Sequence, residues 1–332
     1  MEHIVQTTKK KRKVWTITRN TLIVIAVLLL TWVGFHHAIT AYEKNKYPAP
    51  GHLVEVDSKN MHVYTQGDGE HTILLLPGLG TSAPVLDFEP LINELAKSQR
   101  VVVVEPFGYG WSDQTNKERS VENIVEEVRT ALKQANVTGP FILMPHSVSG
   151  IYSMYYANQY PDEVEAIIGN DITLPQALAY FNEPAPSIPT FMSMLAPTGV
   201  TRLLSYSSPD QFLPEADKGT YSDDNLKMTA LLSAWKGLNK NVVHEAIEMD
   251  NNIQKTKKMS FSPDLPVMLF ARERKDKVSV DGKTNLTFFE SQISHVANSK
   301  LIPLEGHHYL HWTQYKEMSE HINRFIESIE RN

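Results

Sequence analysis

One serine in the middle of the chain is placed where a nucleophile could work. Ser147 lies in the stretch LMPHSVSGIY, between an apolar run and a helix-like run. A serine hydroxyl is a weak nucleophile unless a base removes its proton and a sharp strand-to-helix turn presents it clear of its own backbone. Small residues two positions before and after the serine let such a turn close, and Ser149 fills the second of these positions. We therefore predict that Ser147 is a nucleophile rather than a polar loop residue.

A base for this serine is expected near the C-terminus. The stretch GHHYLHW offers three histidines, His307, His308 and His311, and imidazole is the side chain that most often takes a proton in catalysis. Clustered histidines can also hold zinc. No convincing acidic ligand accompanies them, and the chain has no cysteine. The segment is therefore predicted to supply a base rather than a metal site.

Two carboxylates are candidates to hold the imidazole in its productive tautomer. Asp171 follows an apolar run in IIGNDITLP, and Asp276 follows another in PVMLFARERKDK. Asp276 also has a plain interpretation as a solvated charge in a basic loop, and Glu273 is a third candidate in the same loop. The sequence does not decide between Asp171 and Asp276, so both remain candidates.

The apolar runs before these residues define the expected fold. Short runs rich in Val, Ile and Leu that end in Gly/Pro turns are typical of strands buried on both faces. The chain has six of them, TILLL, VVVVE, FILM, EAIIG, PVMLF and SKLIPL, after two alternating strands in HLVEVDSKNMHVYTQG. Helix-like stretches lie between the runs, which predicts an α/β fold with a mainly parallel sheet flanked by helices. Sites on such sheets lie at the carboxyl ends of the strands.

One long region interrupts this alternation. Residues 174–264 contain early prolines, helical stretches, and methionine and aromatic residues throughout. We interpret the region as a helical cap inserted after the sixth strand, the alternative being a separate helical domain. The core then consists of residues 52–173 and 265–332.

Four motifs in a fixed order resemble the α/β-hydrolase superfamily, in its branch with a serine nucleophile and a helical cap. PGLG follows the third strand, FGYGWSD the fourth, HSVSG the fifth and GHHYLH the eighth, and the resemblance covers roughly residue 53 to the C-terminus. It implies that His308, directly before the aromatic residue, is the catalytic histidine, with His307 as its rival. It also implies an oxyanion hole formed by the backbone N–H groups of Leu79 and Val148.

Two prolines depart from the family pattern. Pro145 replaces the first glycine of the GxSxG elbow, and because proline has a fixed φ, no N–H and more bulk, it puts the geometry of the turn in question. Pro77 replaces the histidine of the family's HGxG, which supports the hole without donating to it. These departures leave open a non-catalytic binding or sensing module on the same fold.

The N-terminus predicts an uncleaved membrane anchor. Five basic residues at positions 9–13 precede an uncharged apolar run over residues 21–35, and a spanning helix needs about 17 to 25 such residues. We expect a basic cytoplasmic tail over 1–13, a transmembrane signal-anchor over 14–39 and a linker over 40–51. A signal peptide shares this pattern, but HHAITA is a poor cleavage site. The positive-inside rule then places the rest of the chain outside the cell.

The net charge and the absence of cysteine exclude some classes of partner and of chemistry. Residues 1–19 carry six Lys/Arg and one Glu, a net charge of +5, which leaves −11 for the rest of a chain whose total is −6. Such an acidic domain is a poor candidate for binding nucleic acid. The absence of cysteine excludes disulfides and thiol catalysis. Cysteine-free exported domains are common in Gram-positive bacteria, which suits that origin.

These features predict a serine hydrolase. In the superfamily that this chain resembles, the epoxide-hydrolase and dehalogenase branches use an aspartate at the elbow. A serine at that position therefore argues against those two branches. What remains is acyl transfer to water through an acyl-enzyme, with no cofactor and no metal, on an ester, thioester or lactone of modest size. The same features also fit a proline iminopeptidase-like aminopeptidase or a scaffold for membrane partners.

Overall fold

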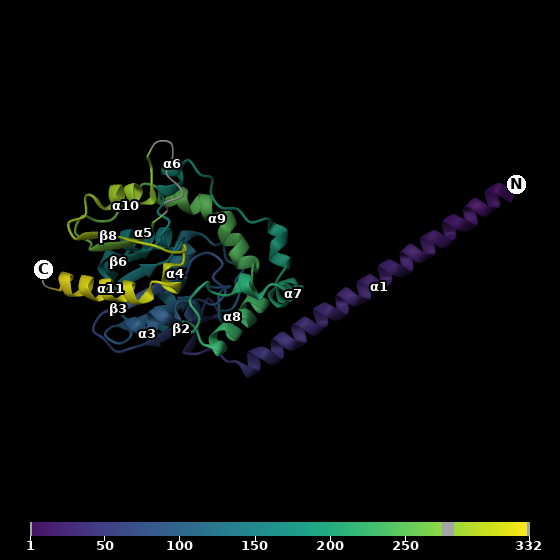
Figure 1. Cartoon of the computed structure of the whole chain (residues 1–332), viewed down its shortest axis with the longest axis horizontal. Helices are drawn as coiled ribbons and strands as arrows, with labels where there is room; N and C mark the ends of the chain where they lie inside the picture. Colours follow the sequence, from purple (N-terminus) through teal and green to yellow (C-terminus); the bar gives the residue numbers. More distant parts are fainter. Residues whose placement is uncertain (1, 274–281, 331–332) are drawn as a thin grey trace.

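The predicted strands form one sheet. A computed structural model describes residues 2–273 and 282–330, and within them the strands follow the order β1-β2-β4-β3-β5-β6-β7-β8 (Figure 1). β2 is antiparallel to both of its neighbours, β1 and β4, and the other neighbouring strands are parallel. The strands are His52–Val56 (β1), Lys59–Gln66 (β2), Thr72–Leu76 (β3), Arg100–Glu105 (β4), Phe141–Pro145 (β5), Val164–Asn170 (β6), Val267–Arg272 (β7) and Ser299–Leu304 (β8). The predicted mainly parallel sheet is confirmed.

Helices cover both faces of this sheet. The helices of the core are α2 (Pro84–Asp87), α3 (Glu89–Leu95), α4 (Val121–Gln134), α5 (Ser149–Gln159), α10 (Asn285–Ile293) and α11 (Tyr315–Ile329), with 3₁₀ turns η1 (Pro161–Glu163) and η4 (Leu310–Trp312). Helices α3 and α11 pack on one face, and α4, α5 and α10 pack on the other.

The side chains of β3 explain why the central strands are apolar throughout. Ile73 and Leu75 pack with α3 and α11, whereas Leu74 and Leu76 pack with α4 and α5. Successive side chains of a strand point to opposite faces of the sheet. All four are buried, which confirms the expectation of strands covered on both faces.

The cap elements lie between β6 and β7, in the interval where the sequence predicts an insertion. They are α6 (Ala177–Phe181), η2 (Thr190–Met194), α7 (Val200–Ser207), η3 (Pro209–Phe212), α8 (Asp223–Lys236) and α9 (Lys240–Thr256). Ser222 and Asn239 accept from backbone N–H groups in the first turns of α8 and α9, so both helices begin at side-chain caps.

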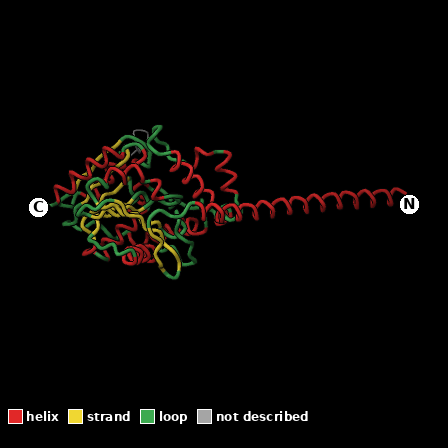
Figure 2. Tube along the Cα trace, turned by 90° about the horizontal axis from the view of Figure 1, so that it is seen from below, coloured by secondary structure: helices red, strands yellow, loops and turns green. Residues whose placement is uncertain are grey.

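One helix stands away from the domain. Helix α1 (Glu2–Lys46) projects from the side on which the cap lies (Figures 1 and 2). Its stretch Arg12–Lys46 is long and apolar enough to cross a membrane, a property that a signal sequence shares. The helix continues to Lys46, so the first part of the segment expected to be a linker, residues 40–46, is helical.

Candidate active site

Ser147 occupies a strained turn between β5 and α5. Its φ is 53°, in the left-handed region that few residues other than glycine adopt. The turn brings α5 close to the loop after β6, and a Cβ added at Gly150 would lie 2.6 Å from the carbonyl oxygen of Thr173. Ser149 donates its hydroxyl to the carbonyl of Pro77 at 2.5 Å. The strand-turn-helix expected around Ser147 is therefore present.

Pro145 does not prevent this turn. It is the last residue of β5 and pairs with Leu76 of β3. The next backbone N–H, that of His146, donates to the carbonyl of Leu76 at 2.9 Å. The ladder thus continues past the proline, and the sharp change of direction falls at Ser147 instead.

The structure brings Ser147, His308 and Asp171 together at the carboxyl ends of β5, β8 and β6. The Nε2 atom of His308 lies 2.9 Å from the hydroxyl oxygen of Ser147. The Nδ1 atom of His308 lies 2.6 Å from Oδ2 of Asp171. A carboxylate only accepts, so Nδ1 carries the proton and Nε2 is free to accept from the serine.

Asp171 is held in place by the backbone around it. Its own N–H donates to the carbonyl of Phe270 at 2.9 Å, and its Oδ1 accepts from the N–H of Arg272 at 3.1 Å. Its side chain is 8% exposed, against 35% for His308. The carboxylate is therefore fixed while the imidazole remains accessible. The other candidate, Asp276, lies outside the described residues.

The remaining two histidines of GHHYLHW have other partners. His307 is exposed, and its ring stacks on Tyr309 and Trp312. His311 is buried; its Nε2 donates to Asp87 at 2.7 Å and its Nδ1 accepts from the side-chain amide of Asn170 at 2.8 Å. Of the three, His308 contacts Ser147.

A fourth histidine, His146, contacts His308 and was not among the site residues predicted from the sequence. Burial holds the pKa of His146 well below its usual value, so this ring is neutral. Its Nε2 donates to the backbone carbonyl of His308 at 3.2 Å, and the two rings are 4.9 Å apart. The sequence signal that could have identified His146 is its position directly before Ser147 in HSVSG. His146 thereby positions the backbone of the candidate base.

The loop that carries one of the two N–H groups expected to form an oxyanion hole approaches Ser147, because a Cβ added at Gly78 would lie 3.1 Å from the Cβ of Ser147. Val148 follows the serine directly, and Leu79 lies in the loop after β3. Among the described residues neither N–H has a hydrogen-bond partner. The next N–H in that loop, at Gly80, donates to the hydroxyl of Tyr109 at 3.2 Å.

A cap residue holds this loop through Tyr109. The Tyr109 hydroxyl donates to Glu245 of α9 at 2.7 Å, and Tyr152 of α5 donates to the same carboxyl group at 2.7 Å. Burial raises the pKa of Glu245 above its usual value, although Arg119 opposes that shift. The chain Glu245–Tyr109–Gly80 thus couples the cap to the loop that carries the Leu79 N–H.

Replacing Tyr109 with phenylalanine tests this coupling. We expect Tyr109→Phe to lower kcat by about tenfold with little change in KM, because a loosened oxyanion donor weakens the transition state more than substrate binding. Tyr152→Phe is the matched control, since it removes a bond of equal length to the same carboxyl group but leaves Gly80 held. Steady-state kinetics of both variants decide: equal effects of the two changes would contradict a specific role for Tyr109.

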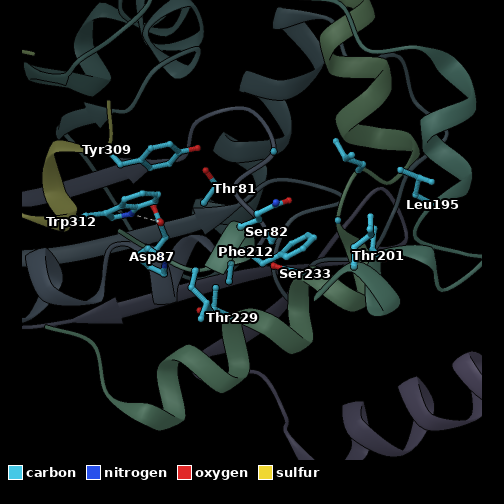
Figure 3. A pocket seen from close by; sticks show the side chains of 18 residues that line it. Thr81, Ser82, Asp87, Leu195, Thr201, Phe212, Thr229, Ser233, Tyr309 and Trp312 are labelled. Atoms are coloured by element: carbon cyan, nitrogen blue, oxygen red, sulfur yellow. Dashed lines mark hydrogen bonds between the residues drawn. The ribbon is translucent and has the colours of Figure 1, made fainter. Parts of the chain in front are cut away.

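A cavity lies between the core and the cap (Figure 3). It measures about 250 Å³. Gly80 and Tyr309 belong to its lining and adjoin, in sequence, Leu79 and His308. Its cap side is mostly apolar and includes Leu195, Leu204, Phe212 and Leu213. A small acyl or alcohol group of modest size can be accommodated there.

Comparisons with known proteins agree with this fold. An uncharacterised protein of Bacillus subtilis, YbdG, is 26% identical over 333 residues, covering 96% of this chain and 99% of that protein. The human serine hydrolase BPHL is 31% identical over 123 residues, covering 35% of this chain and 40% of its own. The crystal structure of a bacterial membrane phospholipase A superposes with a TM-score of 0.58 at 16% identity, over 97% of this chain and 100% of that one.

The match to a protein family decides the assignment. Residues 71–313 match the family model described as the alpha/beta hydrolase fold, which is most of the chain. This range contains the elbow, the cap and the GHHYLHW segment. The chain belongs to the α/β-hydrolase family.

Proposed function

We propose that this protein is a membrane-anchored serine hydrolase that acts on a small ester, thioester or lactone through an acyl-enzyme. One observation carries the proposal: Ser147, in a strained turn, lies 2.9 Å from a histidine that is itself 2.6 Å from a buried aspartate. A nucleophile within hydrogen-bond reach of an oriented base is the arrangement that activates a serine. A non-catalytic binding module has no need of it.

The acylation step follows from these contacts. His308 takes the proton of the Ser147 hydroxyl at Nε2 while the serine oxygen attacks the substrate carbonyl carbon. Asp171 accepts from Nδ1–H and stabilises the imidazolium that forms. The N–H groups of Leu79 and Val148 donate to the oxyanion of the tetrahedral intermediate. The intermediate collapses, and the proton on Nε2 goes to the departing alcohol or thiol.

A water molecule then releases the acyl group from Ser147 in a second half-reaction. His308 removes a proton from a water molecule, which attacks the acyl carbon, and Ser147 leaves with the proton restored. These steps require no metal or organic cofactor. In the epoxide-hydrolase and dehalogenase branches, by contrast, an aspartate occupies the position of Ser147.

The cavity favours an ester over a peptide with a free amino group. Recognition of an ammonium group needs an available acidic side chain. Asp87 is the acidic residue among those that line the cavity. Its Oδ2 accepts from His311 at 2.7 Å and its Oδ1 from Trp312 at 2.8 Å. Each oxygen of Asp87 thus already has a partner within the protein, and we propose an ester rather than a peptide with a free amino group as the substrate.

Helix α1 is proposed as the anchor. Its apolar side chains are exposed, including Leu22, Leu28 and Leu30 at 61%, 63% and 73%, and a helix with such a surface is suited to lipid. Basic residues precede the apolar run, so the positive-inside rule orients the tail to the cytoplasm. The hydrolase domain then lies outside the cytoplasm.

Partitioning experiments test the acyl-enzyme. We expect the purified full chain to hydrolyse the phenyl and p-nitrophenyl esters of the same short acid and, with methanol added, to give the same ratio of methyl ester to free acid from both. A shared acyl-enzyme fixes that ratio whatever the leaving group was. A ratio that changes with the leaving group would exclude a common intermediate. No turnover of esters, thioesters or lactones by the folded chain would favour a binding module.

A further inference from the structure

The cap carries exposed apolar side chains in one stretch of sequence that includes α7 (Val200–Ser207), whose Arg202 binds Glu43 of α1. Outside α1, the described residues include seven large hydrophobic side chains that are exposed, and five of them lie within one stretch of the cap. We call these five the apolar cap patch: Phe191, Met194, Leu203, Leu204 and Tyr206, which are 72%, 57%, 47%, 44% and 67% exposed. Exposed apolar side chains that gather on one surface mark an interaction site, whereas single ones scattered over a protein do not.

Helix α7, which carries three of these residues, is fixed to the end of α1. The guanidinium of Arg202 pairs with Glu43 through two contacts, of 2.9 and 2.6 Å. It also donates to the hydroxyl of Thr40 at 2.9 Å and to Nδ1 of His36 at 3.2 Å. These three partners lie on one face of α1, since they are four and three residues apart. Arg202 is fully buried.

Two further contacts fix the same junction. Trp235 of α8 donates to Glu43 at 2.7 Å. Gly199, at the start of α7, has a φ of 74°, and a Cβ there would lie 2.7 Å from the ring of His36. A buried ion pair with all its hydrogen bonds made costs several kcal/mol to break. The cap therefore cannot swing freely about the end of α1.

The length of α1 sets the depth at which α7 lies. No Asp, Glu, Lys or Arg occurs between Arg19 and Glu43, and at about 1.5 Å per residue this interval is roughly 34 Å long. The hydrocarbon core of a bilayer is about 30 Å thick. A span that starts after Arg19 thus ends within a turn of His36 and Thr40, the residues to which Arg202 binds.

We infer that the apolar cap patch docks into the bilayer leaflet from which the hydrolase domain emerges. The occupant is lipid because the patch is held at the level where the anchor leaves the hydrocarbon core. Figures 1 and 2 show the cap on the side of the domain that faces along α1. Tyr206 suits this layer, with its hydroxyl 3.3 Å from Arg202 and its ring exposed. The inference rests on the proposed anchor.

The cavity under the cap and the apolar cap patch have a residue in common. Leu204 belongs to both, and Leu195 of the cavity directly follows Met194 of the patch. The domain outside the membrane carries a net charge of −11, so attraction to anionic lipid does not explain docking. Insertion of apolar side chains does, and it does not require anionic lipid.

Single-cysteine labelling tests this docking, and the cysteine-free chain makes each label unique. The full-length variants Leu203→Cys and Tyr206→Cys are labelled with bimane and placed in phosphatidylcholine vesicles with brominated or ordinary acyl chains. Leu28→Cys reports on the anchor, and Glu290→Cys, exposed on α10, is the matched control away from α1. We expect brominated lipid to lower the fluorescence at positions 203, 206 and 28 and to leave position 290 unchanged.

Three results would overturn the inference, and each has a different meaning. Quenching at position 28 but not at 203 and 206 would show an anchored chain whose cap does not touch lipid. No quenching at position 28 would contradict the proposed membrane anchor itself, and with it the docking of the apolar cap patch. Disulfide cross-linking between Leu203→Cys copies, without quenching, would assign the patch to a second copy of the chain and also contradict lipid docking.

Discussion

Ser147→Ala is expected to lower kcat/KM for a short ester by about 10⁵-fold, to the floor set by binding and the oxyanion donors alone. The rate falls because the variant lacks the oxygen that attacks the carbonyl. Among the described residues, Ser147 provides the hydroxyl that is hydrogen-bonded to His308, at 2.9 Å. The measurement is the steady-state rate with a p-nitrophenyl ester. The change adds no bulk and no charge, so the fold should be retained.

Ser153→Ala is the matched control for this variant. Ser153 lies in α5, the helix that follows Ser147, and its buried hydroxyl has no hydrogen-bond partner among the described residues. We expect Ser153→Ala to keep a rate within about twofold of the unmodified chain. Comparable losses in the two variants would indicate a disturbed α5 rather than a missing nucleophile.

Asp171→Asn is expected to lower kcat by about 10⁴-fold with a small change in KM. The amide can present its N–H₂ to Nδ1 of His308 and so select the tautomer in which Nε2 carries the proton and cannot accept from Ser147. The variant also removes the charge that stabilises the imidazolium. Single-turnover kinetics with the same ester would separate this chemical loss from product release.

The competing acid provides the control. Asp276→Asn is expected to leave the rate nearly unchanged, because the carboxylate of Asp171 already lies 2.6 Å from Nδ1 of His308. Glu273→Gln belongs in the same comparison. A large loss in Asp276→Asn, with Asp171→Asn active, would transfer the orienting role to Asp276 and contradict the assignment given to Asp171.

Much of the fold could be predicted because its signals are local. Runs such as TILLL and FILM are apolar on both faces of the strand, and both are buried on both faces in the sheet. The turn at Ser147 is also local, since its small residues and neighbours lie within ten positions. Pro145 does not disturb this turn, because the bend falls at Ser147, after the ladder has continued through His146.

The choice of acid could not be predicted in the same way. Asp171 and Asp276 both follow strands, and the distance from either to His308 depends on how strands β6, β7 and β8 are placed side by side. Sequence spacing does not record that distance. The same holds for Arg202, which pairs with Glu43 from 159 residues away, and for His146, whose ring lies beside His308 and His311 of the C-terminal segment.

The most direct test of the central claim is labelling of the full chain with a fluorophosphonate, followed by mass spectrometry of the modified peptide. A serine reacts with this reagent when a base activates it. We expect one adduct, on Ser147, that is lost in Ser147→Ala and His308→Ala and retained in Ser153→Ala. A folded chain that does not label, or that labels equally in His308→Ala, would contradict the activation of Ser147 by His308.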